Sequence, residues 1–279
     1  MIEVKNLTKS YDNKMTAVNN VSFTLGKKIT SIIGRNGAGK TTLLRILSTQ
    51  LLPTSGTASI YGYDVVKEPE AIRNLIVSIP QEARPIYYRT VIDSIRIYLS
   101  ARGIPMDEAD KRARKALKTV GLEHIMNKQC GRLSGGMKRK TFVAMALASS
   151  ARLVILDEPT TGLDPLSRFE VWSAIRSLKS DVIITTHYME EAQQLSDEII
   201  MMDGGKVFSQ GSMESLLKPF RGMVRIESSR KLKGSYRIGK TWISYVSKNE
   251  AEGFVLEGDV IKPVTLDDLF IKKGVNLES

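Results

Sequence analysis

The fold of this chain is decided by one stretch, Gly34-Arg35-Asn36-Gly37-Ala38-Gly39-Lys40-Thr41-Thr42. A short apolar strand over residues 29–33 precedes it, and a helix with apolar residues between Leu43 and Leu47 follows it. Strand, glycine-rich loop, Lys-Thr and helix in this order form a phosphate-binding P-loop. The glycines let successive backbone N–H groups point at phosphate oxygens, and the helix N-terminus adds its positive dipole end. We therefore predict that Lys40 reaches the β- and γ-phosphates of a nucleotide and that the Thr41 hydroxyl ligates Mg²⁺.

A second stretch, residues 153–158, supplies two carboxylates at the end of a buried strand. The apolar run Leu153-Val154-Ile155-Leu156 predicts the strand, and Asp157 and Glu158 follow it directly. Ligands of open α/β sheets bind at the carboxyl ends of the strands. We predict that Asp157 holds Mg²⁺, usually through water, and that Glu158 serves the attacking water as general base or at least orients it. The alternative is that Asp-Glu-Pro only caps a turn.

Outward from these stretches, strands alternate with helices along most of the chain. The pattern predicts strands over residues 75–79, 153–156 and 182–186, helices over about 90–122, after 136 and over about 167–178, and hairpins over 56–64 and around 204–205. This alternation predicts an α/β fold with a mostly parallel sheet that helices cover on both faces. The largely β residues 1–33 and the helical residues from about 85 to 150 are predicted to be appendages to that sheet.

The last part of the chain has a different pattern. After about Phe220 the sequence turns to short strands with many Lys and Gly, and it closes in a helix-like segment over residues 266–271. We predict one domain over residues 1–221 and a small C-terminal α+β accessory unit over residues 222–279. The length of 279 residues is sufficient for one large domain with such an appendage.

The composition limits the possible classes of function but does not identify one. With 42% hydrophobic and 25% charged residues the chain resembles an ordinary soluble protein, and Met1 leads directly into an alternating pattern, so we expect no signal or transit peptide. The longest apolar stretch, residues 142–151, is shorter than the roughly 20 residues that span a membrane. The single cysteine, Cys130, excludes an internal disulfide and suits a reducing cytoplasm. A net charge of +11 fits nucleic acid, an anionic lipid surface or a polyphosphate ligand.

The segment Leu133-Ser134-Gly135-Gly136-Met137 opens a helix with a hydroxyl residue and two glycines. Together with the P-loop and the two carboxylates, it resembles the signature of the ABC ATPase family. The resemblance covers residues 1 to about 218, and the motifs come in the family's order. It implies a P-loop NTPase with a RecA-like core, an N-terminal antiparallel β subdomain and a helical signature subdomain, with ATP and Mg²⁺ as cofactors. It also implies a head-to-tail dimer in which each P-loop faces the Ser134-Gly135-Gly136 segment of the partner.

The resemblance implies further roles for single residues. Gln81 would sense Mg²⁺ and the attacking water, Asp164 would lie in the loop that crosses the dimer interface, and His187 would contact the γ-phosphate and orient Glu158. Tyr11 would stack on adenine. Three of them have a plainer alternative: Gln81 as an ordinary loop glutamine, His187 as a structural histidine and Tyr11 as an aromatic plug at a strand end. The complete expected set is Tyr11, residues 34–42, Gln81, residues 133–136 and Asp164 for the nucleotide, Thr41, Gln81 and Asp157 for the metal, and Glu158, His187 and Lys40 for catalysis.

Two departures from the family pattern indicate a branch. Met137 replaces the glutamine that is commonest at the fifth signature position, and Lys138-Arg139-Lys140 replaces the usual Gln/Arg-rich continuation. Both look like the export-type branch of drug and polysaccharide transporters, as do the stretches 62–65 and 265–270. We therefore expect an exporter.

Three classes of protein use this ATPase. DNA-repair and chromosome ATPases carry long heptad coiled coils or zinc-binding cysteines, and ribosome-bound factors normally carry two ATPase units; neither feature is in this sequence. We therefore expect an ATP-hydrolysing transporter subunit that works with a second ATP-binding subunit and a separate integral membrane permease, and that lies on the inner face of the cell membrane through this permease. We expect no nucleic-acid partner. We further hypothesise that Ile86, Tyr87 and Tyr88 grip a short cytoplasmic helix of the permease, whereas the alternative is a plain surface loop.

Overall fold

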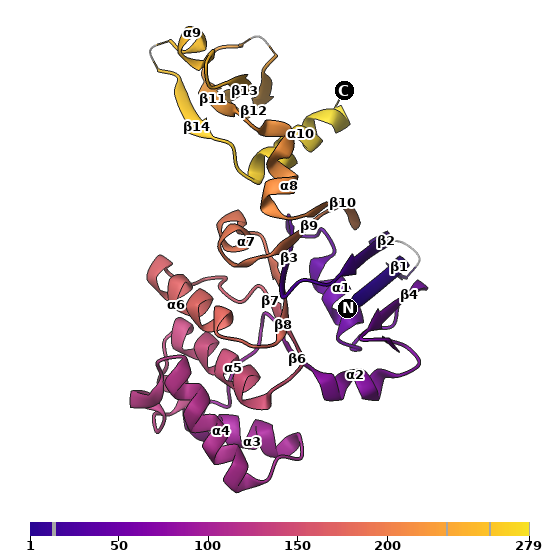
Figure 1. Cartoon of the computed structure of the whole chain (residues 1–279), viewed down its shortest axis with the longest axis vertical. Helices are drawn as coiled ribbons and strands as arrows, with labels where there is room; N and C mark the ends of the chain where they lie inside the picture. Colours follow the sequence, from indigo (N-terminus) through magenta and orange to yellow (C-terminus); the bar gives the residue numbers. More distant parts are fainter. Residues whose placement is uncertain (13–14, 233, 257, 279) are drawn as a thin grey trace. The chain divides into compact units, whose positions relative to one another are not determined.

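The computed structural model of the chain describes residues 1–12, 15–232, 234–256 and 258–278. They form two compact units, Met1–Gln210 and Gly211–Ser279, and each is described by itself (Figure 1). None of the helices in these residues is both long enough and apolar enough to cross a membrane.

The first unit is built on a central sheet with the strand order β10-β9-β3-β8-β7-β6. Its strands are β3 (Ile29–Gly34), β6 (Ile76–Ile79), β7 (Leu153–Asp157), β8 (Asp181–Thr186), β9 (Glu198–Asp203) and β10 (Lys206–Gly211). The pairs from β6 through β7, β8 and β3 to β9 are parallel, as the alternation of strands and helices predicted. Ile33 pairs with Thr186 and Asp157 with Thr185, so the carboxyl ends of β3, β7 and β8 meet at one edge of the sheet.

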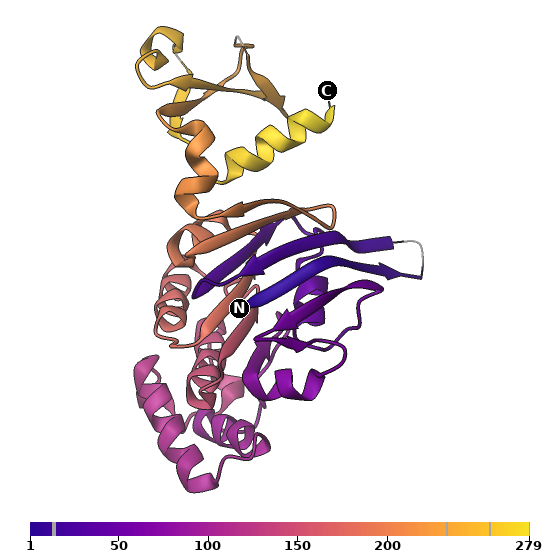
Figure 2. The same ribbon diagram turned by 45° about the vertical axis from the view of Figure 1, so that its right-hand side comes forward.

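The two faces of the central sheet are covered by two separate apolar cores. Along β7, Leu153 and Ile155 belong to one core while Val154 and Leu156 belong to the other, as the two-residue period of a strand requires. The first core contains α1 (Lys40–Leu47) and the N-terminal strands, and the second contains α5 (Gly135–Ser149) and α6 (Pro165–Arg176). Figures 1 and 2 show these elements on opposite sides of the sheet. Because β7 is buried on both faces, apolar residues follow one another along it without alternating with polar ones.

The N-terminal strands form a second, antiparallel sheet with the order β2-β1-β4-β5. It contains β1 (Ile2–Tyr11), β2 (Met15–Leu25), β4 (Ser55–Ile60) and β5 (Tyr63–Asp64). The predicted hairpin over residues 56–64 is confirmed, because β4 pairs antiparallel with β5.

The helical part of the first unit differs from its prediction in detail. The helical pattern over residues 90–122 is two helices, α3 (Val91–Ala101) and α4 (Met106–Thr119). They are separated because Gly103 takes φ 80° and Pro105 precedes the first residue of α4. Short helices η1 (Glu123–Ile125) and η2 (Cys130–Arg132) lead to α5, and α7 (Met189–Leu195) follows β8. The helix α2 (Pro69–Leu75) was not predicted, although a proline in the first turn, here Pro69, is a common start signal.

The second unit begins before the expected boundary at residues 221/222. It contains α8 (Met213–Leu217), η3 (Lys218–Phe220), α9 (Ala251–Phe254), α10 (Asp267–Glu278) and an antiparallel sheet of β11 (Met223–Ser228), β12 (Tyr236–Ile238), β13 (Thr241–Ser247) and β14 (Val260–Pro263). The α8–η3 segment joins this unit because the ring of Phe220 packs 4.9 Å from that of Tyr245 on β13.

Candidate nucleotide-binding site

A cavity of about 370 Å³ lies at the carboxyl ends of the central strands. The P-loop forms one wall of it, and the other walls come from the N-terminal sheet and from the segments after β6 and β7. It is lined by Tyr11, Met15, Ala17, Asn36, Gly37, Ala38, Gly39, Lys40, Thr41, Thr42, Gln81 and Glu158. The structure therefore brings together the P-loop, Tyr11, Gln81 and Glu158 from four separate parts of the sequence.

Two P-loop positions have room only for glycine. A Cβ on Gly39 would lie 2.1 Å from the carbonyl oxygen of Ala17, and a Cβ on Gly34 would lie 2.4 Å from that of Met202. Gly39 also takes φ 94° where it caps α1. The loop is thus held between β2 and the end of β9, and Lys40, Thr41 and Thr42 in the first turn of α1 line the cavity.

The Lys40 ammonium lies inside the P-loop, where the side chain is only 5% exposed. It donates hydrogen bonds to the carbonyl oxygens of Gly34 at 2.8 Å and Arg35 at 3.2 Å, and it lies 3.6 Å from Oε1 of Glu158. A buried ammonium of this kind forms strong, charge-assisted bonds with phosphate oxygens.

Asp157 ends β7 and forms hydrogen bonds with two hydroxyl groups. Thr41 Oγ1 donates to its Oδ1 at 3.2 Å, and Thr185 on the neighbouring β8 donates to the same oxygen. Carboxylate and hydroxyl oxygens are the hard ligands that Mg²⁺ prefers, and it usually takes one or two from the protein and the rest from phosphate and water. No cluster of three or more His, Cys, Asp or Glu side chains in the described ranges could hold a metal without such help. Asp157 and Thr41 therefore fit an Mg²⁺ ion that a nucleotide shares.

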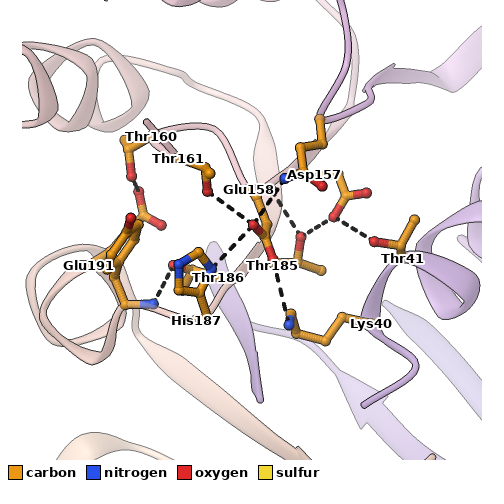
Figure 3. Close-up of polar contacts among 12 residues, drawn as sticks. Lys40, Thr41, Asp157, Glu158, Thr160, Thr161, Thr185, Thr186, His187 and Glu191 are labelled. Carbon is orange, nitrogen blue, oxygen red and sulfur yellow. Dashed lines mark hydrogen bonds and ion pairs between the residues drawn. The ribbon is translucent and has the colours of Figure 1, made fainter. Parts of the chain in front are cut away.

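Four side chains converge on the carboxylate of Glu158 (Figure 3). Thr161 Oγ1 donates to Oε2 at 3.0 Å and Gln81 Nε2 donates to the same oxygen at 3.3 Å. His187 Nδ1 lies 3.2 Å from Oε2, and Lys40 approaches Oε1. Three of these four residues, Lys40, Gln81 and His187, were expected to contact the γ-phosphate, the metal or the water, whereas Thr161 was not.

The backbone of Glu158 has an unusual conformation. Its φ of 46° lies in the left-handed region, which costs a non-glycine residue about 1–2 kcal/mol. The N–H donates to both the carbonyl oxygen and Oγ1 of Thr185, at 3.1 and 3.0 Å. These bonds hold the residue in place and direct the carboxylate into the cavity, while Asp157 faces Thr41. Strained backbone of this type is common at functional sites.

The predicted signature residues do not line this cavity. Ser134 caps α5 by accepting a bond from Met137 N at 3.3 Å, and it is exposed together with Gly135. Leu133 is buried, and Gly136 packs so closely on α6 that a Cβ would lie 2.9 Å from Ser167. Asp164 caps α6, and hydrogen bonds from Ser167 lower the pKa of this exposed carboxyl. A role for residues 133–136 and Asp164 at a nucleotide therefore needs a second subunit.

Tyr11 lies at the end of β1 at the mouth of the cavity. Its side chain is 37% exposed, and Lys9 Nζ lies 5.4 Å from the ring centroid. The ring is therefore placed at the cavity wall rather than in the apolar core. Adenine stacking on this ring stays a prediction.

Several residues that hold the site were not predicted from the sequence. Thr161 and Thr185 were missed, although both lie next to predicted motifs. The signal that could have found them is a hydroxyl residue close to the end of a predicted strand. Arg139 donates from Nη2 to the carbonyl oxygen of Gln81 at 2.6 Å, and burial lowers the pKa of its guanidinium. Glu191 is fully buried on α7, where it accepts bonds from Thr160 at 2.7 Å and Trp172 at 2.9 Å. No sequence signal marks Glu191, because the pair Glu190-Glu191 has the pattern of an exposed helix and nothing in it shows that one of the two is buried.

A larger groove of about 850 Å³ lies at the opposite edge of the sheet, beside α4 and the amino ends of β7 and β8. Lys111, Lys115, Arg152 and Lys179 contribute to its lining. No glycine is among its lining residues, and it is remote from the P-loop. We therefore assign the nucleotide to the smaller cavity.

Comparison with known proteins agrees with this geometry. The sequence profile of the ABC transporter family matches residues 18–161. The retinal-specific phospholipid-transporting ATPase ABCA4 of Homo sapiens is 36% identical over 241 residues, which cover 82% of this chain and 11% of that protein. The doxorubicin resistance ATP-binding protein DrrA of Mycobacterium tuberculosis is 36% identical over 220 residues, which cover 77% of this chain and 66% of DrrA. This chain thus spans about a tenth of the length of ABCA4.

Solved structures resemble about three quarters of the chain. The dimeric ATP-binding cassette MJ0796, in a post-hydrolysis state bound to ADP and Pi, superposes with a TM-score of 0.68 at 27% identity. The match covers 76% of this chain and 98% of that one. The expected P-loop NTPase fold is confirmed, and this chain belongs to the ABC transporter family, as one of its ATP-binding cassettes.

Proposed function

We propose that this chain binds ATP with Mg²⁺ and hydrolyses it as the ATPase subunit of an ABC exporter. The observation that carries the proposal is the convergence of Lys40, Gln81, Thr161 and His187 on Glu158 at the wall of the P-loop cavity. The carboxylate lies beside the phosphate-binding loop yet belongs to a different strand, which is where a group acting on the attacking water is needed.

Each residue has a separate task in this proposal. The P-loop N–H groups and Lys40 bind the phosphates, and Glu158 accepts the proton of a water that attacks the γ-phosphorus as the bond to ADP breaks. His187 and Gln81 orient the carboxylate and the water. Asp157, Thr41 and Gln81 would hold Mg²⁺, which neutralises phosphate charge when bound. Tyr11 would carry the adenine ring.

The active form in this proposal is a head-to-tail dimer. The exposed Ser134-Gly135 helix start and the exposed Asp164 lie outside the cavity of their own chain. A second copy or a close relative would place them on the γ-phosphate, where a further helix N-terminus adds positive potential. The dimeric MJ0796 cassette with ADP and Pi supports this arrangement.

Export through a separate membrane permease is the proposed use of the hydrolysis. The names of DrrA and ABCA4 connect relatives of this chain with drug resistance and phospholipid transport. The proposed contact with the permease is formed by Ile86, Tyr87 and Tyr88, whose side chains are 40%, 74% and 71% exposed. Backbone bonds from Gly131 to Tyr87 and from Cys130 to Arg89 fix this segment beside η2. The chain would then lie on the inner face of the membrane through its permease.

Phosphate release by the purified chain tests the proposal. We expect hydrolysis of ATP that requires Mg²⁺, rises more steeply than linearly with protein concentration because the site needs two subunits, and is lost in Lys40→Met. Lys179→Met, which changes a lysine in the distant basic groove, serves as the matched control. Hydrolysis that is linear in protein, independent of Mg²⁺ or stimulated only by nucleic acid would contradict the proposal.

A further inference from the structure

A stack of three side chains connects His187 with the start of α6. The rings of His187 and Tyr188 are 4.1 Å apart, centroid to centroid, with an angle of 39° between their planes. On the Tyr188 ring lies the guanidinium of Arg168, whose Cζ is 4.2 Å from the centroid. Arg168 Nε in turn donates a hydrogen bond to the carbonyl oxygen of Leu163 at 3.1 Å. The stack thus runs from the loop that ends at Asp164 to the ring beside Glu158.

We propose that Arg168 and Tyr188 are positioning residues for ATP hydrolysis, which hold His187 against Glu158 and make its placement depend on the loop at Leu163 and Asp164. This inference rests on the proposed function, in which Glu158 and His187 act on the attacking water. Arg168, Tyr188 and His187 do not line the nucleotide cavity, whereas Glu158 does. Arg168 and Tyr188 therefore act through the contact of His187 with Glu158, at 3.2 Å from Nδ1 to Oε2.

The orientation of the His187 imidazole is set by its stacking on Tyr188. Nδ1 of His187 has no aligned hydrogen-bond partner among the residues that the structure describes, although Glu158 Oε2 is 3.2 Å away. The backbone next to it is fixed, because Tyr188 N–H donates to Thr186 Oγ1 at 2.9 Å. Ring stacking and a cation over a ring are directional contacts. The Tyr188 ring, held by Arg168, is therefore the contact that sets the plane of the imidazole.

The other end of the stack touches the signature helix. Leu163 is buried, and a Cβ on Gly135 would lie 3.1 Å from its Cδ2. The carbonyl oxygen that anchors Arg168 thus belongs to a residue packed on the first turn of α5. A second subunit that moves this loop would move Arg168 and with it the imidazole of His187. Hydrolysis in one cavity would then depend on an interface contact of the same subunit.

Four single variants and the Tyr188→Leu/Arg168→Gln double variant separate this role from packing alone. Tyr188→Leu removes the ring, Tyr188→Phe retains it, and Arg168→Gln removes the cation and the directed bond. Arg176→Gln is the matched control, because Arg176 is exposed on the same helix. Tyr188 and Arg168 are both only half-buried, so these changes leave the apolar cores intact. The measurements are kcat and KM for ATP, the Kd for a fluorescent ATP analogue, and the unfolding temperature.

The stack predicts a fall in kcat with ATP binding unchanged. We expect Tyr188→Leu and Arg168→Gln each to lower kcat by roughly threefold to tenfold, the scale of one ring or cation–ring contact, with KM and Kd at the wild-type values. Tyr188→Phe should retain the wild-type kcat. The double variant should be no slower than the slower single variant, because both changes break one stack.

Other outcomes overturn the inference in distinguishable ways. Wild-type kcat in Tyr188→Leu would exclude the stack while leaving the proposed function intact. Equal losses in Tyr188→Phe and Tyr188→Leu, or losses that follow a lowered unfolding temperature, would show packing rather than positioning. A wild-type protein that binds ATP but does not hydrolyse it would overturn the proposed function itself, and the stack inference with it.

Discussion

The ammonium of Lys40 and the carboxylate of Glu158 face each other at 3.6 Å across one cavity, although they follow different strands of the central sheet. The pair is almost fully buried, with side-chain exposures of 5% and 9%. In the proposed function, Lys40 binds phosphate and Glu158 acts on the attacking water, and separate mutations of the two residues test the two roles.

Glu158→Gln should bind ATP with Mg²⁺ but lose turnover by about 10² or more, because the amide cannot accept a proton. The amide oxygen can still accept the Thr161 bond, so the geometry is retained. We expect ATP to trap this variant as a dimer, visible by size exclusion, with little phosphate release. Glu190→Gln changes an exposed glutamate and should behave as the wild type. A monomeric Glu158→Gln with near-normal turnover would disprove the assignment.

Tyr11→Ala should weaken nucleotide binding by roughly 1–3 kcal/mol, the range for base–aromatic stacking. Because a ring does not read the edge of a base, ATP and GTP should lose affinity about equally. Titration of fluorescent analogues of both nucleotides measures the effect, and Tyr11→Phe, which keeps the ring, should bind as the wild type. Unchanged affinity in Tyr11→Ala would mean that another group holds the base.

Replacing Tyr87 and Tyr88 together with Ala should leave the ATPase rate of the isolated subunit nearly intact. The two exposed rings do not contact the nucleotide cavity, so the loss should appear as weaker co-purification with the membrane permease and abolished transport. Tyr63→Ala, which removes another exposed tyrosine, is the control. Full co-purification and normal transport by the double variant would place the permease contact elsewhere.

The fully buried Glu191 should make stability depend on pH. Burial raises its pKa above the ordinary value of 4.5, so the folded protein retains a proton that the unfolded chain releases. The contribution of this group to stability is complete below pH 4.5 and is lost as the pH rises toward the raised pKa. Relative to Glu191→Gln, which does not titrate, the wild type should therefore lose stability as the pH increases.

Urea unfolding of both proteins between pH 4.5 and 8 measures this difference. The difference in stability between the wild type and Glu190→Gln, which changes an exposed glutamate, should not vary with pH in this way. If the curves for wild type and Glu191→Gln run parallel over the whole range, the buried carboxyl has an ordinary pKa.

The parts of the structure that the sequence predicted are those with local signals. The P-loop and β7 depend on residues that are adjacent in the sequence, and the carboxyl-end rule for parallel strands then brings Lys40 near Glu158. The separation of α3 from α4 was also encoded locally, by Gly103 and Pro105, but the continuous helical period concealed it.

The parts that could not be predicted depend on contacts between distant segments. Glu191 is buried because Thr160 and Trp172 approach it from other elements, and the Arg168–Tyr188–His187 stack exists only after β8 and α6 have packed. The boundary of the second unit depends on the contact of Phe220 with Tyr245. None of these contacts has a fixed sequence spacing.

The pairing of Asp157 with Thr185 has a consequence for changes in chain length. Successive residues of a strand point to opposite faces, so a shift of one residue exchanges what each face presents. Deleting one residue from β7 would bring Glu158 opposite Thr185, with a side chain one methylene longer than that of Asp157 directed at Thr41. Two adjacent acidic residues are therefore not interchangeable here, and exchanging Asp157 with Glu158 should lower phosphate release even though both carboxylates are kept.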